Sequence, residues 1–400
     1  MDITTHPIWS QKAPTTKQKI SKFKKPFHLA RIYLAKQYAK LFPGSTFIGV
    51  TGSVGKTTTV KALEMVLSKK FNVLTTKANL DPILNIPETI LKAKRSTNKI
   101  VLEMGIEYLG EMDFYLSLVK PQTCIITTIA YQHSEFLGDL ESIASEKGKL
   151  IESLPGGGKA FLNFDDVNVR KLAETTKAEV IFYGTDEKNC QVWASNVKIE
   201  NFITSFEINY GVERVEINYP LLGEHQIYPA LAAASVGISE GVSLIQVKKA
   251  LEQMTPEEHR MEIFQGYNNS IIIDDSYNGS PVSIEAALNT LEQIPAKRRI
   301  LVLGETKELG KYSEKLHRQI AQKIYSERID FVYLGTGDTK YVAEELLSLG
   351  FLPEKMEANL QNPQVVSKLL KVLSKGDVCL VKGSRSLRLD EVVTRIVKKQ

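Results

Sequence analysis

The stretch from Gly49 to Thr58 places the tightest constraint on how this chain can fold. It reads GVTGSVGKTT, follows the apolar run FIGV and precedes a segment that we expect to form a helix over 56–68. A strand, a glycine-rich loop and a Lys-Thr pair at the start of a helix form a cradle for nucleotide phosphates. Glycines let backbone N–H groups approach phosphate oxygens, and a helix N-terminus favours negative charge. The alternative is an ordinary strand-to-helix turn, which does not require glycines in register with Lys-Thr.

The phosphate-binding residues that this loop predicts are Gly52, Ser53, Val54, Gly55, Lys56, Thr57 and Thr58. In such loops the lysine bridges the outer phosphates and the following hydroxyl binds Mg²⁺. The usual spacing asks for glycine at position 50, which is valine here, and the glycines lie at 49, 52 and 55. The loop is therefore a variant of the common pattern.

The composition is that of a soluble globular protein with two or three domains: 400 residues, of which 43% are hydrophobic and 24% charged. No apolar run is long enough to span a bilayer, and the N-terminus lacks a signal-peptide pattern. The three cysteines lie far apart, without zinc-site spacing. We interpret them as buried free thiols in a reducing, cytoplasmic compartment. We expect a monomer with no nucleic-acid partner.

The positive charge of the chain is concentrated at its front. Residues 1–44 hold nine Lys or Arg and one acidic residue, and the segment from His28 to Phe42 is amphipathic. A basic amphipathic segment is able to contact anionic lipid, so peripheral membrane contact through 1–44 is one hypothesis. We favour the plainer interpretation of a solvated tail and a helix packed on the body, because charge runs are commonly just solvated.

From residue 46 the chain alternates short apolar strands with helical stretches, which predicts an α/β fold with a mainly parallel sheet. Strands are expected at 46–50, 100–104, 123–129 and 160–163, and helices at 141–153 and 230–239. Alternating apolar positions over 191–220 predict antiparallel strands attached to this sheet. A second α/β unit has expected strands at 271–273, 300–303, 331–334 and 378–381.

We therefore expect three parts. Residues 1–45 form a basic tail and a helix, 46–257 a central domain with the phosphate loop, and 258–400 a Rossmann-like C-terminal domain. Each strand of the second unit ends in a polar or glycine cluster: Asp274-Asp275, Gly304-Glu305, Gly335 and Lys382-Gly383-Ser384-Arg385. Open α/β sheets bind ligands at the carboxyl ends of their strands, so these clusters predict a binding edge that faces the central domain.

Three side chains of the central domain are further candidates. Glu103 ends one expected strand and His133 follows another, on the edge that carries the phosphate loop, where both could reach a metal bound to a nucleotide. An ordinary surface or core histidine is an equally good interpretation of His133. Lys147 lies in an expected helix, and spacing alone makes it a solvated charge.

The run TGSVGKTTT resembles the ATP loop of Mur ligases, the enzymes that add amino acids to the peptidoglycan stem peptide. The resemblance covers about 46–397 and rests on further blocks in the same order: LEMGIEYLGEM at 102–112, the block around His133 and Glu135, EKGK at 146–149, GEHQIYPALAAA at 223–234, HRM at 259–261, IDDSYNGSP at 273–281, VLGETKELG at 302–310 and LVKGSR at 380–385. The IDDSYN, VLG…ELG and KGSR blocks are most similar to the type that adds D-alanyl-D-alanine to UDP-N-acetylmuramoyl-tripeptide, the MurF type.

This resemblance implies an amide ligase that uses ATP and Mg²⁺ on a cell-wall precursor peptide and an amino acid or dipeptide. ATP phosphorylates a carboxylate, an amine attacks the acyl phosphate, and phosphate leaves as the amide forms. The protein must mainly position the reactants and neutralise charge. Two alternatives stay open: a related ligase on a non-UDP substrate, of the pseudomurein or poly-glutamate type, and an ATP-binding switch or scaffold without ligase activity.

The resemblance also implies roles for individual residues. The implied catalytic residues are Lys56, His133, Lys147 and Arg260, and the implied magnesium ligands are Thr57, Glu103, His133 and a carbamylated Lys147. Besides the loop, the implied nucleotide contacts are His225, Gln226, Arg260, Asp275 and Asn278. The implied substrate contacts are Asn79, Lys382, Ser384 and Arg385. Retention of all four catalytic residues argues against a mere switch.

The sequence departs from the family pattern at several positions. The Asn-x-Asn-Asn block reads Asn79-Leu80-Asp81-Pro82, Gln226 and Pro229 stand where the family has asparagines, Lys149 replaces a glutamate, and Gln132 replaces an alanine. Only about 45 residues precede the ATP loop, where the family has a domain that grips the UDP-sugar. We therefore expect either that the sugar nucleotide is held differently or that the substrate lacks this handle.

Overall fold

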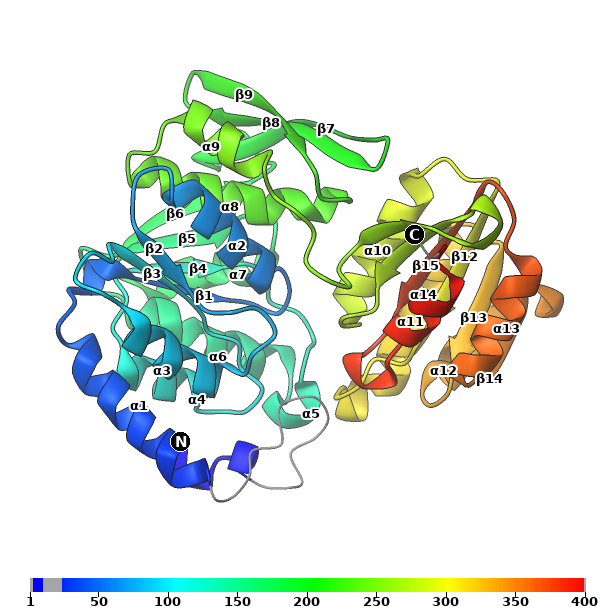
Figure 1. Ribbon diagram of the computed structural model, residues 1–400, viewed down its shortest axis with the longest axis horizontal. Coiled ribbons are helices and arrows are strands. Elements are labelled where there is room, and N and C mark those ends of the chain that lie inside the picture. Colours follow the sequence, from blue (N-terminus) through cyan, green and yellow to red (C-terminus); the bar gives the residue numbers. More distant parts are fainter. Residues whose placement is uncertain (1–2, 10–23, 399–400) are drawn as a thin grey trace.

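The computed structural model describes residues 3–9 and 24–398. Figure 1 shows two α/β bodies that lie side by side, with the helix α1 (Lys25–Ala39) along the outer side of the first. The central sheet has nine strands in the order β2-β3-β1-β4-β5-β6-β7-β8-β9, and the C-terminal sheet has six in the order β10-β11-β15-β12-β13-β14. The predicted α/β fold is confirmed.

The central sheet is parallel from β2 to β7 and ends in an antiparallel meander. Its strands are β1 (Phe47–Thr51), β2 (Val73–Thr75), β3 (Lys99–Glu103), β4 (Thr123–Ile126), β5 (Lys159–Asn163), β6 (Glu179–Gly184), β7 (Val192–Glu200), β8 (Ile203–Tyr210) and β9 (Glu213–Tyr219). The strand predicted at 123–129 stops at Ile126, because the next residues turn to the phosphate loop, where the Ser53 N–H donates to the Thr128 carbonyl over 2.7 Å.

Helices cover both faces of this sheet and bury two apolar layers. They are α2 (Lys56–Leu67), α3 (Pro82–Lys92), α4 (Glu111–Leu118), α5 (Ser134–Leu137), α6 (Leu140–Glu152), α7 (Val167–Lys171), α8 (Ile227–Ser239) and α9 (Leu244–Leu251). Helices α2, α8 and α9 pack on one face around Leu63 and Val66, and α1, α3, α4 and α6 pack on the other around Ile86 and Leu150. Such two-sided cover explains why the parallel strands are almost wholly apolar.

The C-terminal sheet is parallel except for its edge strand β10. Its strands are β10 (Glu262–Gln265), β11 (Ile271–Asp275), β12 (Arg298–Leu303), β13 (Phe331–Gly335), β14 (Met356–Leu360) and β15 (Asp377–Lys382), and its helices are α10 (Pro281–Gln293), α11 (Ser313–Ser326), α12 (Thr339–Ser348), α13 (Asn362–Val372) and α14 (Asp390–Ile396). Since β11, β15 and β12 are neighbours, their carboxyl ends lie together, as the polar clusters predict.

The front of the chain packs on the central domain. Helix α1 begins three residues before the predicted start at His28, with Pro26 in its first turn, and contacts α3 and α4. Its inner face buries Ile32, Ala35 and Ala39. A helix packed on the body is therefore what forms, as we favoured. Within residues 3–9 and 24–398, none of the helices combines the length and apolarity that crossing a bilayer would need. All three cysteines are buried and free, as predicted.

Candidate active site

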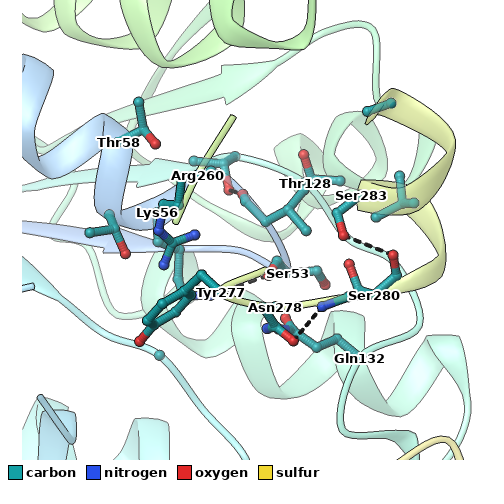
Figure 2. A pocket seen from close by; sticks show the side chains of 18 of the residues that line it. Ser53, Lys56, Thr58, Thr128, Gln132, Arg260, Tyr277, Asn278, Ser280 and Ser283 are labelled. Carbon is teal, nitrogen blue, oxygen red and sulfur yellow. Dashed lines mark hydrogen bonds between the residues drawn. The ribbon is translucent and has the colours of Figure 1, made fainter. Parts of the chain in front are cut away.

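A cavity of about 690 Å³ lies between the central and C-terminal domains. Figure 2 shows Lys56 of the loop, with Arg260 and Tyr277 from the other domain, around it. Most of the predicted site residues line this cavity: Ser53, Val54, Gly55, Lys56, Thr57, Thr58, Asn79, Glu103, His133, His225, Gln226, Arg260, Asp275, Asn278, Lys382, Ser384 and Arg385. Gly52 and Lys147 are not among the lining residues.

The phosphate loop requires glycine at two positions. Gly52 has φ 146°, and a Cβ there would lie 2.0 Å from the Thr127 hydroxyl oxygen, so no other residue fits. Gly55 has φ 83° and directly precedes α2. Lys56 folds back over the loop, and its Nζ donates to the Gly52 carbonyl over 2.9 Å and to the Ser53 carbonyl over 3.3 Å. The amine thus stands at the N-terminus of α2, where a phosphate would bind.

An oxygen-rich pair lies next to the loop. The Thr57 hydroxyl donates to both carboxylate oxygens of Glu103, over 3.1 and 3.3 Å. Hydroxyl and carboxylate oxygens are the ligands that Mg²⁺ prefers. These two predicted metal ligands are therefore together beside the loop.

His133 is held by the opposite domain. It has φ 54° at the start of α5, and its Nδ1 pairs with the Glu308 carboxylate. The Glu135 N–H donates to the Glu308 carbonyl over 3.0 Å, and the Ser134 hydroxyl donates to the Leu309 carbonyl over 3.1 Å. The ELG block that contains Glu308 therefore fixes the loop that presents His133 to the cavity.

Lys147 is buried beneath the phosphate loop, not solvated. Its side chain is 1% exposed on α6, and its Nζ donates to the Gly52 carbonyl over 3.1 Å. Burial and the nearby Lys56 charge hold the pKa of Lys147 well below its usual value, although Glu111 and Glu146 oppose the shift. The interpretation from spacing alone was wrong, because helical spacing does not reveal which face of α6 meets the sheet.

On the C-terminal side, cations surround the cavity. The Arg260 guanidinium lies over the Tyr277 ring, 4.1 Å from its centroid. Lys382 is 2% exposed, forms an ion pair with Asp275 and donates to the Asn278 carbonyl over 3.0 Å. Asp275 and Lys382 therefore hold each other at the ends of β11 and β15.

The last two residues of the KGSR block differ in how they are held. The Ser384 hydroxyl accepts the Lys307 N–H over 2.8 Å. The side chain of Arg385 is 41% exposed and lies 3.5 Å from the Asp390 carboxylate. Of the two, Arg385 is the more available to a ligand.

The departure from the family pattern at 81–82 has a local explanation. Asp81 is the N-cap of α3, where its side chain accepts the Ile83 N–H over 2.9 Å, and Pro82 occupies the first turn. The sequence change at 81–82 thus builds a helix start beside Asn79, which lines the cavity.

His225 lies in the wall of the same cavity. Burial lowers the pKa of His225 to about 4, with Lys382 lowering it further and Asp275 opposing, so the ring is neutral at neutral pH.

Several polar atoms of the cavity wall lack hydrogen-bond partners. Among the described residues that line it, six have a buried side-chain atom without a hydrogen bond: Gln132 Oε1, His225 Nδ1, Arg260 Nε, Ser280 Oγ, Thr306 Oγ1 and Arg385 Nη1. Buried polar atoms are normally paired, so such a concentration indicates a polar ligand. Donors, acceptors and cations around one glycine-rich loop fit a magnesium nucleotide.

The sequence did not reveal some lining residues. Asp165 and Asp166 follow β5 at the same edge; Asp166 accepts the Ile129 N–H over 2.9 Å and Asp165 accepts the Tyr228 hydroxyl over 3.1 Å. The signal that could have identified them is a pair of carboxylates just after the strand expected at 160–163. Conversely, neither Gly335 nor Glu305 lines the cavity, and the Glu305 carboxylate accepts the Asp338 N–H over 3.1 Å.

The chain matches two family models. The Mur ligase middle domain matches residues 50–237, and the Mur ligase glutamate ligase domain matches residues 259–385. Together they cover most of the two α/β bodies.

Among curated proteins, the chain is 31% identical over 366 residues to the UDP-N-acetylmuramoyl-tripeptide--D-alanyl-D-alanine ligase of Bacillus subtilis, covering 91% of this chain and 78% of the relative. It is 30% identical over 351 residues to the ligase of the same name from Escherichia coli, covering 86% of this chain and 75% of the relative.

Solved structures agree on the fold. MurF from Acinetobacter baumannii superposes with a TM-score of 0.84 at 24% identity, covering 92% of this chain and 80% of the other. MurF from Thermotoga maritima in complex with ADP gives 0.81 at 23% identity, covering 92% and 82%. A pseudomurein peptide ligase type C from Methanothermus fervidus gives 0.70 at 17% identity, covering 88% and 79%. This chain belongs to the Mur ligase family, whose members are ATP-dependent peptide ligases.

Proposed function

We propose that this ligase joins D-alanyl-D-alanine to the terminal carboxylate of a muramoyl tripeptide in cell-wall precursor synthesis. The observation that carries the proposal is the cavity itself, in which the phosphate loop of one domain faces Arg260, Lys382 and Arg385 of the other. The relatives of that activity, about 30% identical over most of the chain, support the choice of substrates.

The central domain would bind the phosphates of ATP and the Mg²⁺ ion. ATP supplies the phosphoryl group that turns the carboxylate into an acyl phosphate, and Mg²⁺ offsets phosphate charge. Lys56 and the backbone N–H groups after Gly55 hold the outer phosphates, while Thr57 and Glu103 offer oxygens to the metal. Arg260 approaches from the other domain and neutralises the charge that develops on the transferred group.

Lys147 has the properties that carbamylation requires. A neutral ε-amine attacks CO₂, a nitrogen–carbon bond forms, and one N–H proton leaves. Burial and the nearby Lys56 charge lower the pKa of this amine, which favours its neutral form. The resulting carbamate places a negative charge next to Gly52, where its oxygens would join the Glu103 carboxylate and the His133 ring nitrogen as ligands for Mg²⁺.

The C-terminal domain would bind the incoming amine substrate. The guanidinium of Arg385 is able to pair in a bidentate fashion with the carboxylate of an incoming dipeptide. Ser384 and Lys382 lie beside it, and Asn79 lies on the acceptor side of the cavity. His225 and Gln226 would contact the base of the nucleotide, and Asp275 and Asn278 would contact its ribose.

We propose the domain limits 1–45, 46–257 and 258–400. The first residues of the last domain include two non-glycine residues with positive φ, His259 at 62° and Met261 at 53°. Residues in such strained backbone regions persist where the surrounding structure holds them in place. We propose that the two bodies turn on each other at this segment. Rotation there would bring Arg260 toward the phosphates.

The experiment is phosphate release from ATP against a matrix of acceptors and amines, with the ligated product identified by mass. The acceptors are UDP-muramoyl peptides and the same peptides without UDP, and the amines are single amino acids and D-alanyl-D-alanine. The proposal requires turnover with a UDP-muramoyl tripeptide and the dipeptide. Turnover with unlinked peptides alone would favour a ligase of the pseudomurein or poly-glutamate type. ATP binding without ligation of any pair would favour a switch or scaffold.

A further inference from the structure

The outer face of α1 is apolar although it packs on nothing in the described chain. Phe27 is 78% exposed, Leu34 57% and Leu41 73%, and Tyr33 beside them is 63% exposed. Seven-residue spacing puts Phe27, Leu34 and Leu41 on one side of the helix and of the turn that follows it. Single exposed apolar side chains are ordinary, but a row of three large ones, with Tyr33 beside it, marks an interaction surface.

The flanks of this row are basic. Residues 24–44 contain Lys24, Lys25, Arg31, Lys36 and Lys40 and no acidic residue. Arg31 contacts Glu88, and Lys25 contacts the Thr4 carbonyl. Among the described residues, no carboxylate lies within ion-pair distance of Lys24, Lys36 or Lys40. An apolar row between lysines that pair with no described carboxylate fits a partner with an anionic surface and an apolar interior.

A second hollow continues this surface at the end of α1. It measures about 480 Å³ and lies between the ends of α1 and α4. Its walls are largely apolar, with Phe42, Phe47 and Leu116, and three lysines line it as well, Lys36, Lys40 and Lys120. Apolar walls with ammonium groups around them suit a lipid, whose acyl chain is apolar and whose phosphate is negative.

We propose that α1, with the hollow beside it, is a docking surface for an anionic lipid bilayer. The surface is defined by Phe27, Tyr33, Leu34 and Leu41 for the apolar contact and by Lys24, Lys36, Lys40 and Lys120 for the lipid headgroups. It is independent of which amide bond the enzyme forms.

A second copy of the chain fits this surface less well. A two-fold contact through α1 would place the same basic flanks against each other, since an isologous interface pairs a patch with itself. Like charges opposed across an interface oppose association, whereas an anionic bilayer neutralises them. The charge pattern therefore selects the bilayer.

Residues 3–9 connect the start of α1 to the central domain. His6 is 3% exposed, and its Nε2 lies 2.8 Å from the Glu111 carboxylate. The other oxygen of Glu111 accepts the Tyr108 N–H over 3.2 Å, in the loop that borders the cavity at Glu107. Lys25 lies 5.9 Å from the centroid of the buried Trp9 ring. A bilayer-bound α1 would thus hold the catalytic cavity at a fixed position relative to the membrane.

This surface leaves the proposed domain movement unhindered. Figure 1 shows α1 at the outer edge of the central domain, on the side away from the C-terminal body. Contacts made through α1 involve neither the segment near His259 nor the β11–β15–β12 edge. The enzyme can therefore remain bound to a bilayer while its two domains open and close.

The test is cosedimentation of the full chain with vesicles of phosphatidylcholine alone or with phosphatidylglycerol added. We expect binding only to the anionic vesicles, with release at high salt. The charge variant K36E/K40E/K120E should lose at least about tenfold in binding, since each lysine at such a surface is worth about fivefold. The apolar variant F27S/L34S should lose binding as well.

Matched controls carry the same changes elsewhere. K315E/K371E/K375E alters three exposed lysines of the C-terminal domain, and I245S/L347S alters two exposed apolar side chains; both should bind as the parent does. Thermal melting checks that each variant is folded. Failure of the parent to bind anionic vesicles would overturn the proposal, and so would equal binding by all variants. A dimer in sedimentation velocity that F27S/L34S abolishes would assign the face to a second copy instead.

Discussion

The ε-amino group of Lys147 and the backbone carbonyl of Gly52 are joined by a hydrogen bond of 3.1 Å. Lys56 donates to the same carbonyl from the other side over 2.9 Å. One carbonyl of the phosphate loop therefore joins the lysine expected at the phosphates to the lysine expected to carry the carbamate. Two ammonium groups so close would repel, which is why one of them must be neutral or converted to an anion.

Replacement of Lys147 tests the carbamate directly. Lys147→Ala should lower ligase turnover by about 100-fold or more, the upper range for loss of a group that supports a bound metal. Acetate or another short acid should partly restore turnover, because its carboxylate can occupy the space of the carbamate. The control is Lys149→Ala on the same helix, whose amine pairs with Asp113 and Glu146 near the surface. Full activity of Lys147→Ala would contradict the role.

Activity should also depend on pH and CO₂ in a defined direction. Because the folded state lowers the pKa of Lys147, its neutral form is present above that pKa and disappears as the pH falls through it. Carbamylation requires the neutral amine, so turnover should rise with pH on the acid side and fall in CO₂-depleted buffer. Bicarbonate should restore it. Turnover that is indifferent to bicarbonate at every pH would contradict carbamylation.

The lowered pKa of Lys147 also makes the free energy of unfolding depend on pH in a defined direction. Between the lowered pKa and the usual value of 10.5, the unfolded chain binds more protons at Lys147 than the folded chain does. The free energy of unfolding contributed by this group therefore rises with pH over that window. Chemical denaturation of CO₂-free protein, compared with Lys147→Met, would isolate this contribution as a difference in slope with pH.

Magnesium dependence should report the pair that Thr57 forms with Glu103. Glu103→Gln keeps the shape but removes the charge, so the Mg²⁺ concentration for half-maximal turnover should rise by about 10- to 100-fold. Thr57→Ser retains the hydroxyl and should change this Mg²⁺ concentration little. Thr57→Ala removes the hydroxyl and should raise it as Glu103→Gln does. An unchanged Mg²⁺ requirement in Glu103→Gln would remove this carboxylate from the metal site.

Nucleotide binding should draw the two domains together. The turn at His259 and Met261 is stabilised locally: the His259 ring contacts the Asp274 carboxylate over 2.7 Å, and the His259 N–H donates to Glu262 over 2.7 Å. Small-angle scattering should show a smaller radius of gyration with a non-hydrolysable ATP analogue. Lys56→Ala, which removes a phosphate contact, should show less contraction. Identical profiles with and without the analogue would argue against closure.

Much of the fold followed from the sequence, because buried parallel strands leave apolar runs that are easy to recognise. The strands around Ile48, Ile125, Ile272 and Leu380 lie where those runs predict them. Strands β6 and β14 were not predicted, and neither were the short strands β2 and β10. The burial patterns of Val73–Thr75 and Glu262–Gln265 show only half-buried or exposed residues, so neither segment leaves an apolar run.

The site was less accessible to sequence reasoning. Residues of the phosphate loop were identified by their spacing, since backbone geometry dictates glycine there. The burial of Lys147 and the contact of His133 with Glu308 depend on how α6 and two separate domains pack, which no local pattern encodes. The resemblance to Mur ligases supplied their expected roles, and the structure adds the physical reasons that a buried lysine and a cross-domain carboxylate provide.

The central claim is that the bound ATP activates a carboxylate as an acyl phosphate. The most direct measurement uses a muramoyl tripeptide in which both oxygens of the terminal carboxylate are a heavy isotope, with D-alanyl-D-alanine and unlabelled ATP. One carboxylate oxygen becomes bonded to the transferred phosphorus and leaves with it when the amine attacks. The account predicts that the released phosphate contains one heavy oxygen for each amide formed. Unlabelled phosphate alongside amide product would contradict it.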